Sequence, residues 1–304
     1  MSASHDIAFV VATKDRPDEL RRLWQSLRFQ SRVPDEVVIV DASARPSTLV
    51  GPQAGPPVLR YIRTAVASAT RQRNIGLDAV RPEADLVGFL DDDAVLEEGA
   101  VEEMLRFWGS AGAEVGGAAF NMANHPPLEW PLLKRTRFAE SLGLYAGRGG
   151  SVTPSGFQTM IGPLARTEWT DWLPSGASVW RREVARANRF DEWFDGYSYL
   201  EDLDFSYRVG KSHKLAVVAG ARYHHLQAPG GRGGSYTFGL REVLNRVHFV
   251  KKYPELSLRK CYAALSVRLL MSLALAARGR QASFLARAFG NTVGLVRSAI
   301  NARG

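Results

Sequence analysis

Three short apolar runs, each followed at once by polar residues, constrain the fold of this chain more than any other feature. They occupy residues 7–12, 36–40 and 86–90. Compact runs of this kind are typical of strands buried on both faces of a sheet. Between the first two runs, Leu20, Leu23 and Leu27 recur at the spacing of an amphipathic helix. This alternation of strand and helix predicts an α/β protein with a doubly wound, mostly parallel sheet flanked by helices.

The polar residues at the ends of the predicted strands are the first sign of a functional site. Thr13, Asp41 and an aspartate triplet at 91–93 each follow an apolar run. In open α/β sheets, ligands bind beyond the carboxyl ends of the strands, so we expect these residues to converge. We also expect Asp15 to cap the helix that follows the first strand, with Pro17 near its first position.

The triplet Asp91-Asp92-Asp93 is the strongest single motif. Three adjacent carboxylates repel one another unless a cation neutralises them. Carboxylate oxygens suit Mn²⁺ or Mg²⁺, which commonly bridge phosphate groups. The alternative is an acidic turn exposed to water. The position directly after a buried strand favours the metal site.

A second acidic group contains Glu201, Asp202 and Asp204, and aromatic residues precede it. Aromatic bulk can desolvate a carboxylate, which raises its pKa and suits it to act as a general base. We expect Asp202 to take this role, with Glu201 beside it. The alternative is that Glu201 or Asp204 caps the N-terminus of a helix.

Two adjacent histidines and a glycine-rich loop follow. A neutral imidazole of His224 or His225 could complete a metal site begun by the aspartates, although a lone histidine is more often structural. The loop at 230–234 carries Arg232, and its backbone amides and guanidinium suit a pyrophosphate. The alternative for this loop is a hinge between domains.

Taken in order, six motifs resemble the family 2 glycosyltransferases of GT-A fold. They lie at residues 11–17, 40–41, 73–76, 89–93 and 201–204, and at His225. The resemblance spans roughly residues 5–235. Within that large family, the chain looks most like bacterial enzymes that build surface polysaccharides, rhamnosyltransferase-like members included.

The resemblance implies an inverting hexosyltransferase that uses a UDP-, dTDP- or GDP-linked sugar as donor. It implies a metal site of Asp93 and His225, with His225 preferred to His224 because the family pattern runs His-Leu-x-x-Pro-Gly-Gly. It assigns the role of catalytic base to Asp202. The family often has a small residue at the position of Asp92, so which of the three aspartates contacts the ion stays open.

The remaining implied roles concern the two substrates. The donor-binding positions are Thr13, Arg16, Asp41, Arg73, Asn74, Asp91, Asp92 and Arg232. The loop over the donor sugar and acceptor contains Trp172, Ser175 and Gly176. The acceptor is expected to be a glycan or a lipid-linked saccharide, and residues 121–175 are rich enough in loop residues to form a lid or an acceptor-binding insertion.

Charge divides the chain into a catalytic domain at 1–235 and a basic helical extension at 236–304. Residues 232–304 contain 13 Lys and Arg but only two acidic residues, whereas the rest of the chain has a net charge of −3. Such asymmetry indicates an anionic partner. No catalytic cluster is evident in the extension.

Residues 261–277 are apolar but interrupted by Arg268, which favours a helix lying in a membrane interface over one that spans it. The leucines expected to face lipid are Leu265, Leu269, Leu273 and Leu275. The basic residues expected near anionic headgroups are Arg259, Lys260, Arg278 and Arg280. The alternative is a helical subdomain that packs on the catalytic domain or on a second subunit in a homodimer.

Composition narrows the location and the rival functions. The single cysteine, Cys261, excludes an internal disulfide, and the first residues lack a basic apolar leader. We therefore expect a cytoplasmic protein, peripheral on the inner face of the cell membrane. A sugar-phosphate nucleotidyltransferase would usually have a glycine-rich loop after its first strand, and residues 13–18 contain no glycine. A nucleic-acid-binding protein is disfavoured because the basic residues lie beside leucines rather than aromatic residues.

Overall fold

The computed structural model describes residues 5–47, 55–125, 136–141, 143, 145–196, 198–226, 234–279 and 282–300. The chain forms two compact units. The first consists of Met1–Pro127 and Ile161–Pro229, and the second of Leu128–Met160 and Gly230–Gly304. Part of the loop-rich middle of the chain therefore belongs to the same unit as the C-terminal helices.

A single mixed sheet forms the centre of the first unit. In the described residues its strands follow the order β3-β2-β1-β4-β8-β6-β9-β5, with β7 beside β9. Four neighbouring strands that run parallel to one another form one half of the sheet: β1 (Ile7–Thr13), β2 (Glu36–Asp41), β3 (Val58–Arg63) and β4 (Leu86–Asp91). The doubly wound α/β fold expected from the apolar runs is confirmed, because each of these runs forms a strand of this parallel half.

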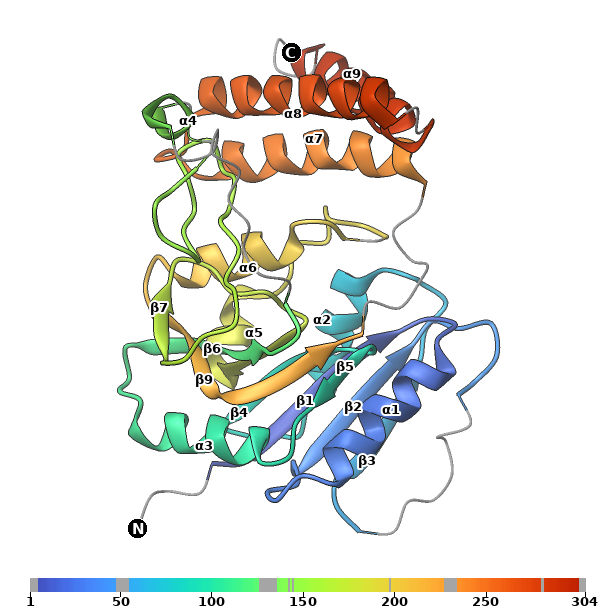
Figure 1. Cartoon of the computed structure of the whole chain (residues 1–304). Coiled ribbons are helices and arrows are strands. Elements are labelled where there is room, and N and C mark those ends of the chain that lie inside the picture. Colours follow the sequence, from blue (N-terminus) through green and yellow to red (C-terminus); the bar gives the residue numbers. More distant parts are fainter. Residues whose placement is uncertain are drawn as a thin grey trace. The chain divides into compact units, whose positions relative to one another are not determined.

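Helices cover both faces of the sheet (Figure 1). Helices α1 (Pro17–Arg28) and α3 (Ala100–Ser110) pack on one face. Helices α2 (Ala69–Ala79), α5 (Arg182–Asn188) and α6 (Glu201–Val209) pack on the other. Along β1, Phe9 joins the core beneath α1, while Val10 joins the core beneath α2. Burial of both faces explains why the strand is apolar without alternation.

The N-terminus of α1 differs from the expectation in one detail. Pro17 is at the start of the helix as predicted, but the N-cap residue is Arg16, without a side-chain cap hydrogen bond. Asp15 has φ 54°, and its carboxylate accepts from the backbone N–H of Ala44 instead, at 3.2 Å. The prediction that Asp15 caps the helix is therefore wrong, because its side chain ties the first loop to the loop after β2.

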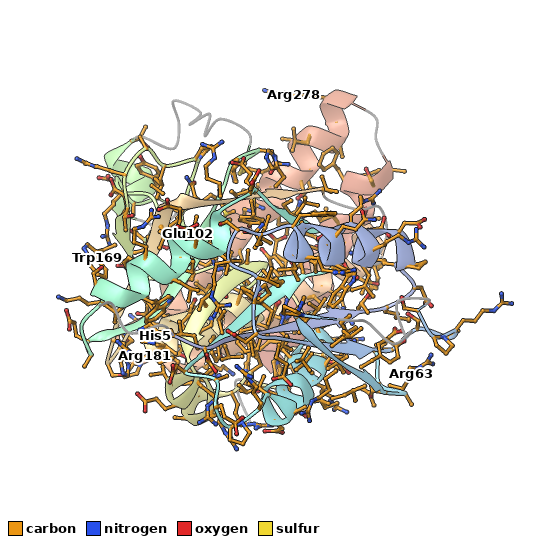
Figure 2. The ribbon with its side chains drawn as sticks, turned by 90° about the horizontal axis from the view of Figure 1, so that it is seen from below. His5, Arg63, Glu102, Trp169, Arg181 and Arg278 are labelled. Carbon is orange, nitrogen blue, oxygen red and sulfur yellow. The ribbon has the colours of Figure 1, made fainter. Side chains whose placement is uncertain are left out.

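The second half of the sheet contains strands that the apolar runs did not predict. They are β5 (Ala94–Leu96), β6 (Val115–Met122), β7 (Glu168–Thr170), β8 (Ala177–Arg181) and β9 (Lys214–His225). β8 runs antiparallel to both β4 and β6, and β5 runs antiparallel to the end of β9. Trp169 of β7 lies beside α3, where its ring centroid is 6.5 Å from that of Phe107 (Figure 2).

The second unit is built on three long helices, as the helical pattern beyond Tyr236 predicts. They are α7 (Ser235–Lys252), α8 (Leu258–Gly279) and α9 (Ala282–Ile300), and a short helix α4 (Arg137–Ser141) belongs to the same unit. Small residues let α7 and α9 approach closely. A Cβ added to Gly290 would lie 2.1 Å from the backbone oxygen of Tyr236, and one added to Gly239 would lie 2.2 Å from that of Arg287.

A buried carboxylate joins the three helices. Glu242 of α7 accepts hydrogen bonds from Arg268 of α8 and from Arg287 and Asn291 of α9. Burial alone would raise the pKa of Glu242, but the two guanidinium groups and the amide outweigh it and hold that pKa below its ordinary value. This network accounts for Arg268, the basic residue that interrupts the apolar run.

Helix α8 is long and apolar enough to cross a membrane by length and composition. Core helices of soluble proteins also have this length and composition. In the structure Cys261, Ala264 and Leu265 of α8 are buried. The expectation that Leu265 faces lipid is therefore wrong, since it lies on the inner side of the helix, whereas Leu273 is exposed.

We expect Gly290→Ala to destabilise the second unit by about 1–3 kcal/mol, because the added methyl group would collide with the backbone of α7. Thermal unfolding followed by circular dichroism measures the effect. Gly234→Ala is the matched control, since a Cβ at Gly234 meets nothing within 4 Å. Equal unfolding midpoints for the two variants would contradict the close packing of α7 and α9.

Candidate active site

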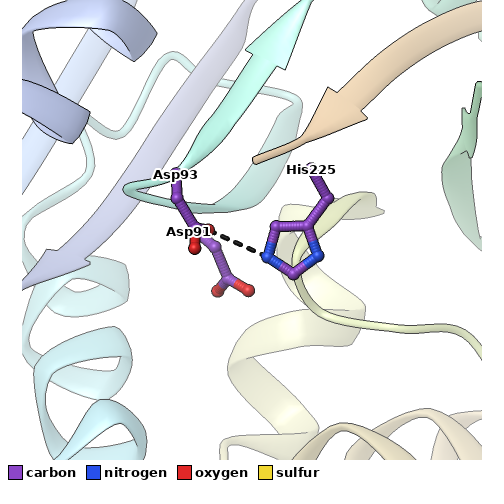
Figure 3. A group of neighbouring side chains, drawn as sticks. All are labelled: Asp91, Asp93 and His225. Atoms are coloured by element: carbon purple, nitrogen blue, oxygen red, sulfur yellow. Dashed lines mark ion pairs between the residues drawn. The ribbon is translucent and has the colours of Figure 1, made fainter. Parts of the chain in front are cut away.

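Asp91, Asp93 and His225 come together at the carboxyl edge of the sheet, although the histidine is more than 130 residues from the aspartates (Figure 3). One ligand atom from each side chain lies within 4.8 Å of the other two. Nε2 of His225 is 2.9 Å from Oδ1 of Asp93. Asp93 is buried, and the other two residues are partly exposed.

The pairing of β5 with β9 explains this convergence. Asp91 ends β4, and the chain turns through the triplet directly into β5. Ala94 of β5 pairs with His225 across the antiparallel ladder, and the backbone N–H of Leu226 donates to the carbonyl of Asp93 at 3.0 Å. His225, the last residue of β9, is thereby held beside Asp93, which lies in the turn leading into β5.

The two adjacent histidines have different partners. Successive residues of a strand point to opposite faces of the sheet. His225 points to the aspartates, whereas Nε2 of His224 lies 2.8 Å from Oε1 of Glu97, which also accepts from Arg222. His225, the histidine that the family pattern indicates, therefore lies beside Asp93, whereas His224 contacts Glu97.

Asp92, the middle residue of the triplet, has partners in the segment after β1, and one of them, Arg16, also lies 3.6 Å from Asp93. Its carboxylate accepts from the hydroxyl of Thr13 at 2.8 Å and from Arg16 at 3.0 Å. Burial raises the pKa of Asp92 to about 6, although both hydrogen bonds lower it. Asp92 thus holds two of the predicted donor-binding residues in place, while Asp91 and Asp93 share the metal group.

Arg73 links the aspartate triplet to the second acidic group. One of its terminal nitrogens donates to Asp91 and the other to Glu201, each at 2.8 Å. Its guanidinium carbon lies 5.3 Å from the ring centroid of Phe190, and its side chain is buried. Both ends of the guanidinium fork are therefore engaged with protein carboxylates, which fixes the distance between the two acidic groups.

Other residues of α2 hold the segment that leads to these carboxylates. The amide of Asn74 donates to the carbonyl of Phe190 at 2.9 Å and accepts from its N–H at 2.9 Å. The hydroxyl of Thr70 donates to the carbonyl of Phe194 at 3.1 Å. Asn74 therefore positions the backbone of the segment before Glu201.

Gln72 belongs to the same helix, and the sequence gave no signal for it. Its side-chain amide donates to the carbonyls of Thr13 and Val40, at 2.9 and 2.8 Å. The helix therefore supports the ends of β1 and β2 as well as the acidic segment. Its polar residues recur at nearly every position, so helical periodicity alone could not distinguish them.

Glu201 and Asp202 begin α6 as an acidic pair. Burial and the charge of Asp202 raise the pKa of Glu201 to about 8, despite the opposing effect of Arg73. Burial also raises the pKa of Asp202, against the backbone N–H of Leu203 and the charge of Arg73. The residue before the pair, Leu200, has φ 76°, a backbone region that costs a non-glycine residue energy and recurs at functional sites.

Asp41 ends β2 at the carboxyl edge of the sheet, where it is paired with Thr13 in the register of β1 and β2. It is fully buried, and its carboxylate accepts from the N–H of Ser43 at 2.7 Å and from the hydroxyl of Tyr61. Burial and the hydrogen bond to Asp41 raise the pKa of Tyr61. Tyr61 of β3 is an additional residue of this end of the site.

The predicted acceptor loop runs along the metal group. Gly176 accepts from the backbone N–H of Asp91 at 2.9 Å, and a Cβ at Gly176 would lie 2.9 Å from the Asp91 carboxylate. Trp172 and Ser175 of the same loop are buried. Burial and the charges of nearby aspartates raise the pKa of Tyr223, which keeps its hydroxyl protonated beside Gly176. Arg232 lies outside the described residues.

The residues present fit a divalent cation. Two carboxylates and an imidazole offer ligand atoms of the kinds that Mn²⁺ accepts, and carboxylate oxygens also suit Mg²⁺. Asp91 ends β4, Asp93 lies in the turn that leads into β5, and His225 ends β9, which pairs with β5, so the sheet brings the three groups together. A cation there would relieve the repulsion between Asp91 and Asp93.

Comparison with known proteins identifies a family. The family model of glycosyl transferase family 2 matches residues 8–165, which is more than half of the chain. The match includes β1, β2, α2 and the aspartate triplet. No curated protein sequence matches the chain significantly.

Solved structures of low sequence identity share the fold. The fragment 1-349 of TarS from S. aureus has a TM-score of 0.53 at 15% identity, covering 84% of this chain and 67% of that one. The mannosyltransferase PcManGT from Pyrobaculum calidifontis, solved with GDP-Man and Mn²⁺, has 0.51 at 15%, covering 94% and 86%. GalNAc-T7, solved with UDP, GalNAc and Mn²⁺, has 0.57 at 11%, covering 87% and 55%.

These matches confirm the GT-A fold. The chain spans 42% of a longer TarS chain, so the matches do not carry the activity of those whole proteins.

A Mn²⁺-binding measurement would show which of the two histidines contributes to the metal group. We expect His225→Ala to weaken Mn²⁺ binding at least about tenfold, because it removes the imidazole from the group with Asp91 and Asp93. Isothermal titration calorimetry measures the affinity. His224→Ala is the matched control and should bind Mn²⁺ normally, since its ring contacts Glu97. Equal losses in both variants would exclude a metal role specific to His225.

Proposed function

Because the chain belongs to glycosyl transferase family 2, we propose that this glycosyltransferase is an inverting hexosyltransferase. It would move a sugar from a UDP-, dTDP- or GDP-linked donor to a hydroxyl of a glycan or lipid-linked acceptor. The observation that carries the proposal is the link through Arg73, which holds the group of Asp91 next to the acidic pair that contains Asp202. A leaving-group site and a base are thereby fixed relative to each other.

The donor would lie along the carboxyl edge of the parallel strands. Asp41, supported by Tyr61, stands at the end where the nucleoside would bind. Thr13 and Arg16, held by Asp92, come next along the edge. The diphosphate would then reach Asp93 and His225, in the order expected for a nucleotide sugar that extends from base to sugar.

The residues of the metal group favour departure of the nucleotide. A bound Mn²⁺ or Mg²⁺ would supply positive charge that stabilises the diphosphate leaving group. Asp91, Asp93 and His225 would hold that ion. Gly176 lets the loop over the donor sugar approach Asp91 without a side chain between them.

Asp202 would act as the base. It accepts the proton of the acceptor hydroxyl while that oxygen bonds to the anomeric carbon from the face opposite the diphosphate. The bond between the anomeric carbon and the diphosphate oxygen breaks in the same displacement, so the anomeric configuration inverts. The raised pKa of Asp202 makes its carboxylate a stronger base than an exposed aspartate.

The variant Asp202→Asn would test whether Asp202 serves in catalysis or in donor binding. We expect transfer to fall on the order of 10²–10⁴-fold, because the amide cannot accept the acceptor proton. Donor affinity with Mn²⁺, measured by calorimetry, should stay within about twofold. Glu183→Gln, an exposed acid on α5, is the activity control. Loss of donor affinity in step with activity would assign Asp202 to binding, and a product with retained configuration by NMR would exclude the single displacement.

The pH dependence of the reaction tests the role of Arg73. The charge of Arg73 lowers the pKa values of both Glu201 and Asp202. The base acts in its deprotonated form, so activity falls as the pH drops below its pKa. We expect Arg73→Gln to move this acid limb of kcat/KM to higher pH by about one unit or more. A lower rate with an unchanged pH profile would contradict the electrostatic link.

A further inference from the structure

The second unit exposes an apolar face that the proposed function does not use. Leu285, Phe289, Val296 and Ile300 of α9 are between 55% and 65% exposed. Their spacing of four, seven and four residues places them on one side of the helix. Large side chains in such a row are unusual on a surface exposed to water and indicate an interaction site.

The opposite side of α9 shows that this exposure is a property of the helix orientation. Ala288, Asn291, Gly294 and Ser298 are buried. Asn291 bonds to α7, and a Cβ on Gly294 would lie 2.7 Å from Val243 of α7. The small residues of α9 therefore make the internal contact, and the large apolar ones face outward.

Helix α8 contributes to the same kind of surface. Leu270 is 63% exposed, and Met271, Leu273 and Leu275 are exposed as well. The sequences of α8 and α9 contain no Asp or Glu. Arg259, Arg278 and Arg297 are exposed on these two helices, and Figure 2 labels Arg278 near the end of α8. The surface therefore combines apolar side chains with positive charge alone.

We propose that the exposed face of α8 and α9 docks into the interface of a bilayer that contains anionic lipid. Interfacial helices combine a large apolar side with cationic residues, which attract acidic headgroups. The leucines and Phe289 would enter the boundary of the acyl chains, and the arginines would remain at headgroup level. The proposal goes beyond the glycosyl transfer and does not depend on it.

The internal contacts of α8 favour docking over spanning. Arg268, near the middle of the helix, donates to the buried carboxylate of Glu242. Cys261 and Leu265 are buried within the unit. A spanning orientation would have to place this ion pair in the acyl region, where charged groups are costly. An interfacial orientation leaves the pair inside the protein.

Charge also distinguishes a bilayer from a second copy of the chain. Two copies that met through these helices would bring arginines together without a carboxylate on either surface. Like charges at such an interface oppose association. An anionic bilayer supplies the missing negative charge.

Vesicle sedimentation of the full chain tests the proposal. Vesicles of phosphatidylcholine with roughly 30% phosphatidylglycerol should bind the protein. Vesicles of pure phosphatidylcholine should bind it at least about tenfold more weakly, because each basic residue near an anionic surface adds about 1 kcal/mol. Binding should weaken as salt is raised, because salt screens surface charge. Equal binding to both vesicle types, or none to either, overturns the proposal.

Two sets of variants assign the surface. Leu285→Ser with Phe289→Ser and Val296→Ser should reduce binding to anionic vesicles about tenfold or more. The control is Phe29→Ser, since Phe29 of the first unit is 79% exposed. Arg278→Gln and Arg297→Gln should each reduce binding about fivefold, and Arg28→Gln should not.

Circular dichroism spectra should be recorded for each variant to check that it is folded. Unchanged vesicle binding by the α9 variant overturns the proposal. Conversion of a dimer to a monomer by that variant, without vesicle binding by the wild type, would assign the face to a second copy and also overturn it. Resistance of the bound protein to alkaline carbonate would show a spanning helix in place of an interfacial one.

Discussion

Repulsion between carboxylates is the constraint on which the site depends. Five acidic residues, at 91–93 and 201–202, gather at one edge of the sheet, where burial makes negative charge costly. The chain opposes that charge with one arginine for each subset. Arg16 serves Asp92, and Arg73 serves Asp91 and Glu201. Arg16 also lies 3.6 Å from Asp93, and Asp93, His225 and Asp91 together form the group suited to a cation.

This division gives each member of the aspartate triplet a separate task. Asp91 and Asp93 share the metal group, and Asp91 also fixes Arg73. Asp92 accepts hydrogen bonds from Thr13 and Arg16. A small residue at position 92 would leave Arg16 without this partner. The third carboxylate therefore organises the segment after β1, and its presence is consistent with a cation held by its two neighbours.

The sequence predicted the features that depend on residues close together in the chain, and it missed most of those that depend on contacts between distant segments. The runs at 7–12, 36–40 and 86–90 are local, and they predicted the parallel half of the sheet and the polar residues at its edge. β5 has three residues, and β6 contains adjacent glycines, so neither produced a strand pattern. Tyr61, Gln72 and Tyr223 entered the site through contacts between distant segments. The residue types suggested a metal site shared by the aspartates and one of the two histidines, and the family resemblance selected Asp93 and His225.

The contact between Gly176 and Asp91 couples two positions 85 residues apart. A side chain at position 176 would meet the Asp91 carboxylate at 2.9 Å, and the Gly176 carbonyl already holds the backbone of the same aspartate. Neither residue can grow while the other keeps its place. Homologous chains in which the first residue of the triplet is an aspartate are therefore expected to favour a glycine here, because any larger residue would force that carboxylate to shift.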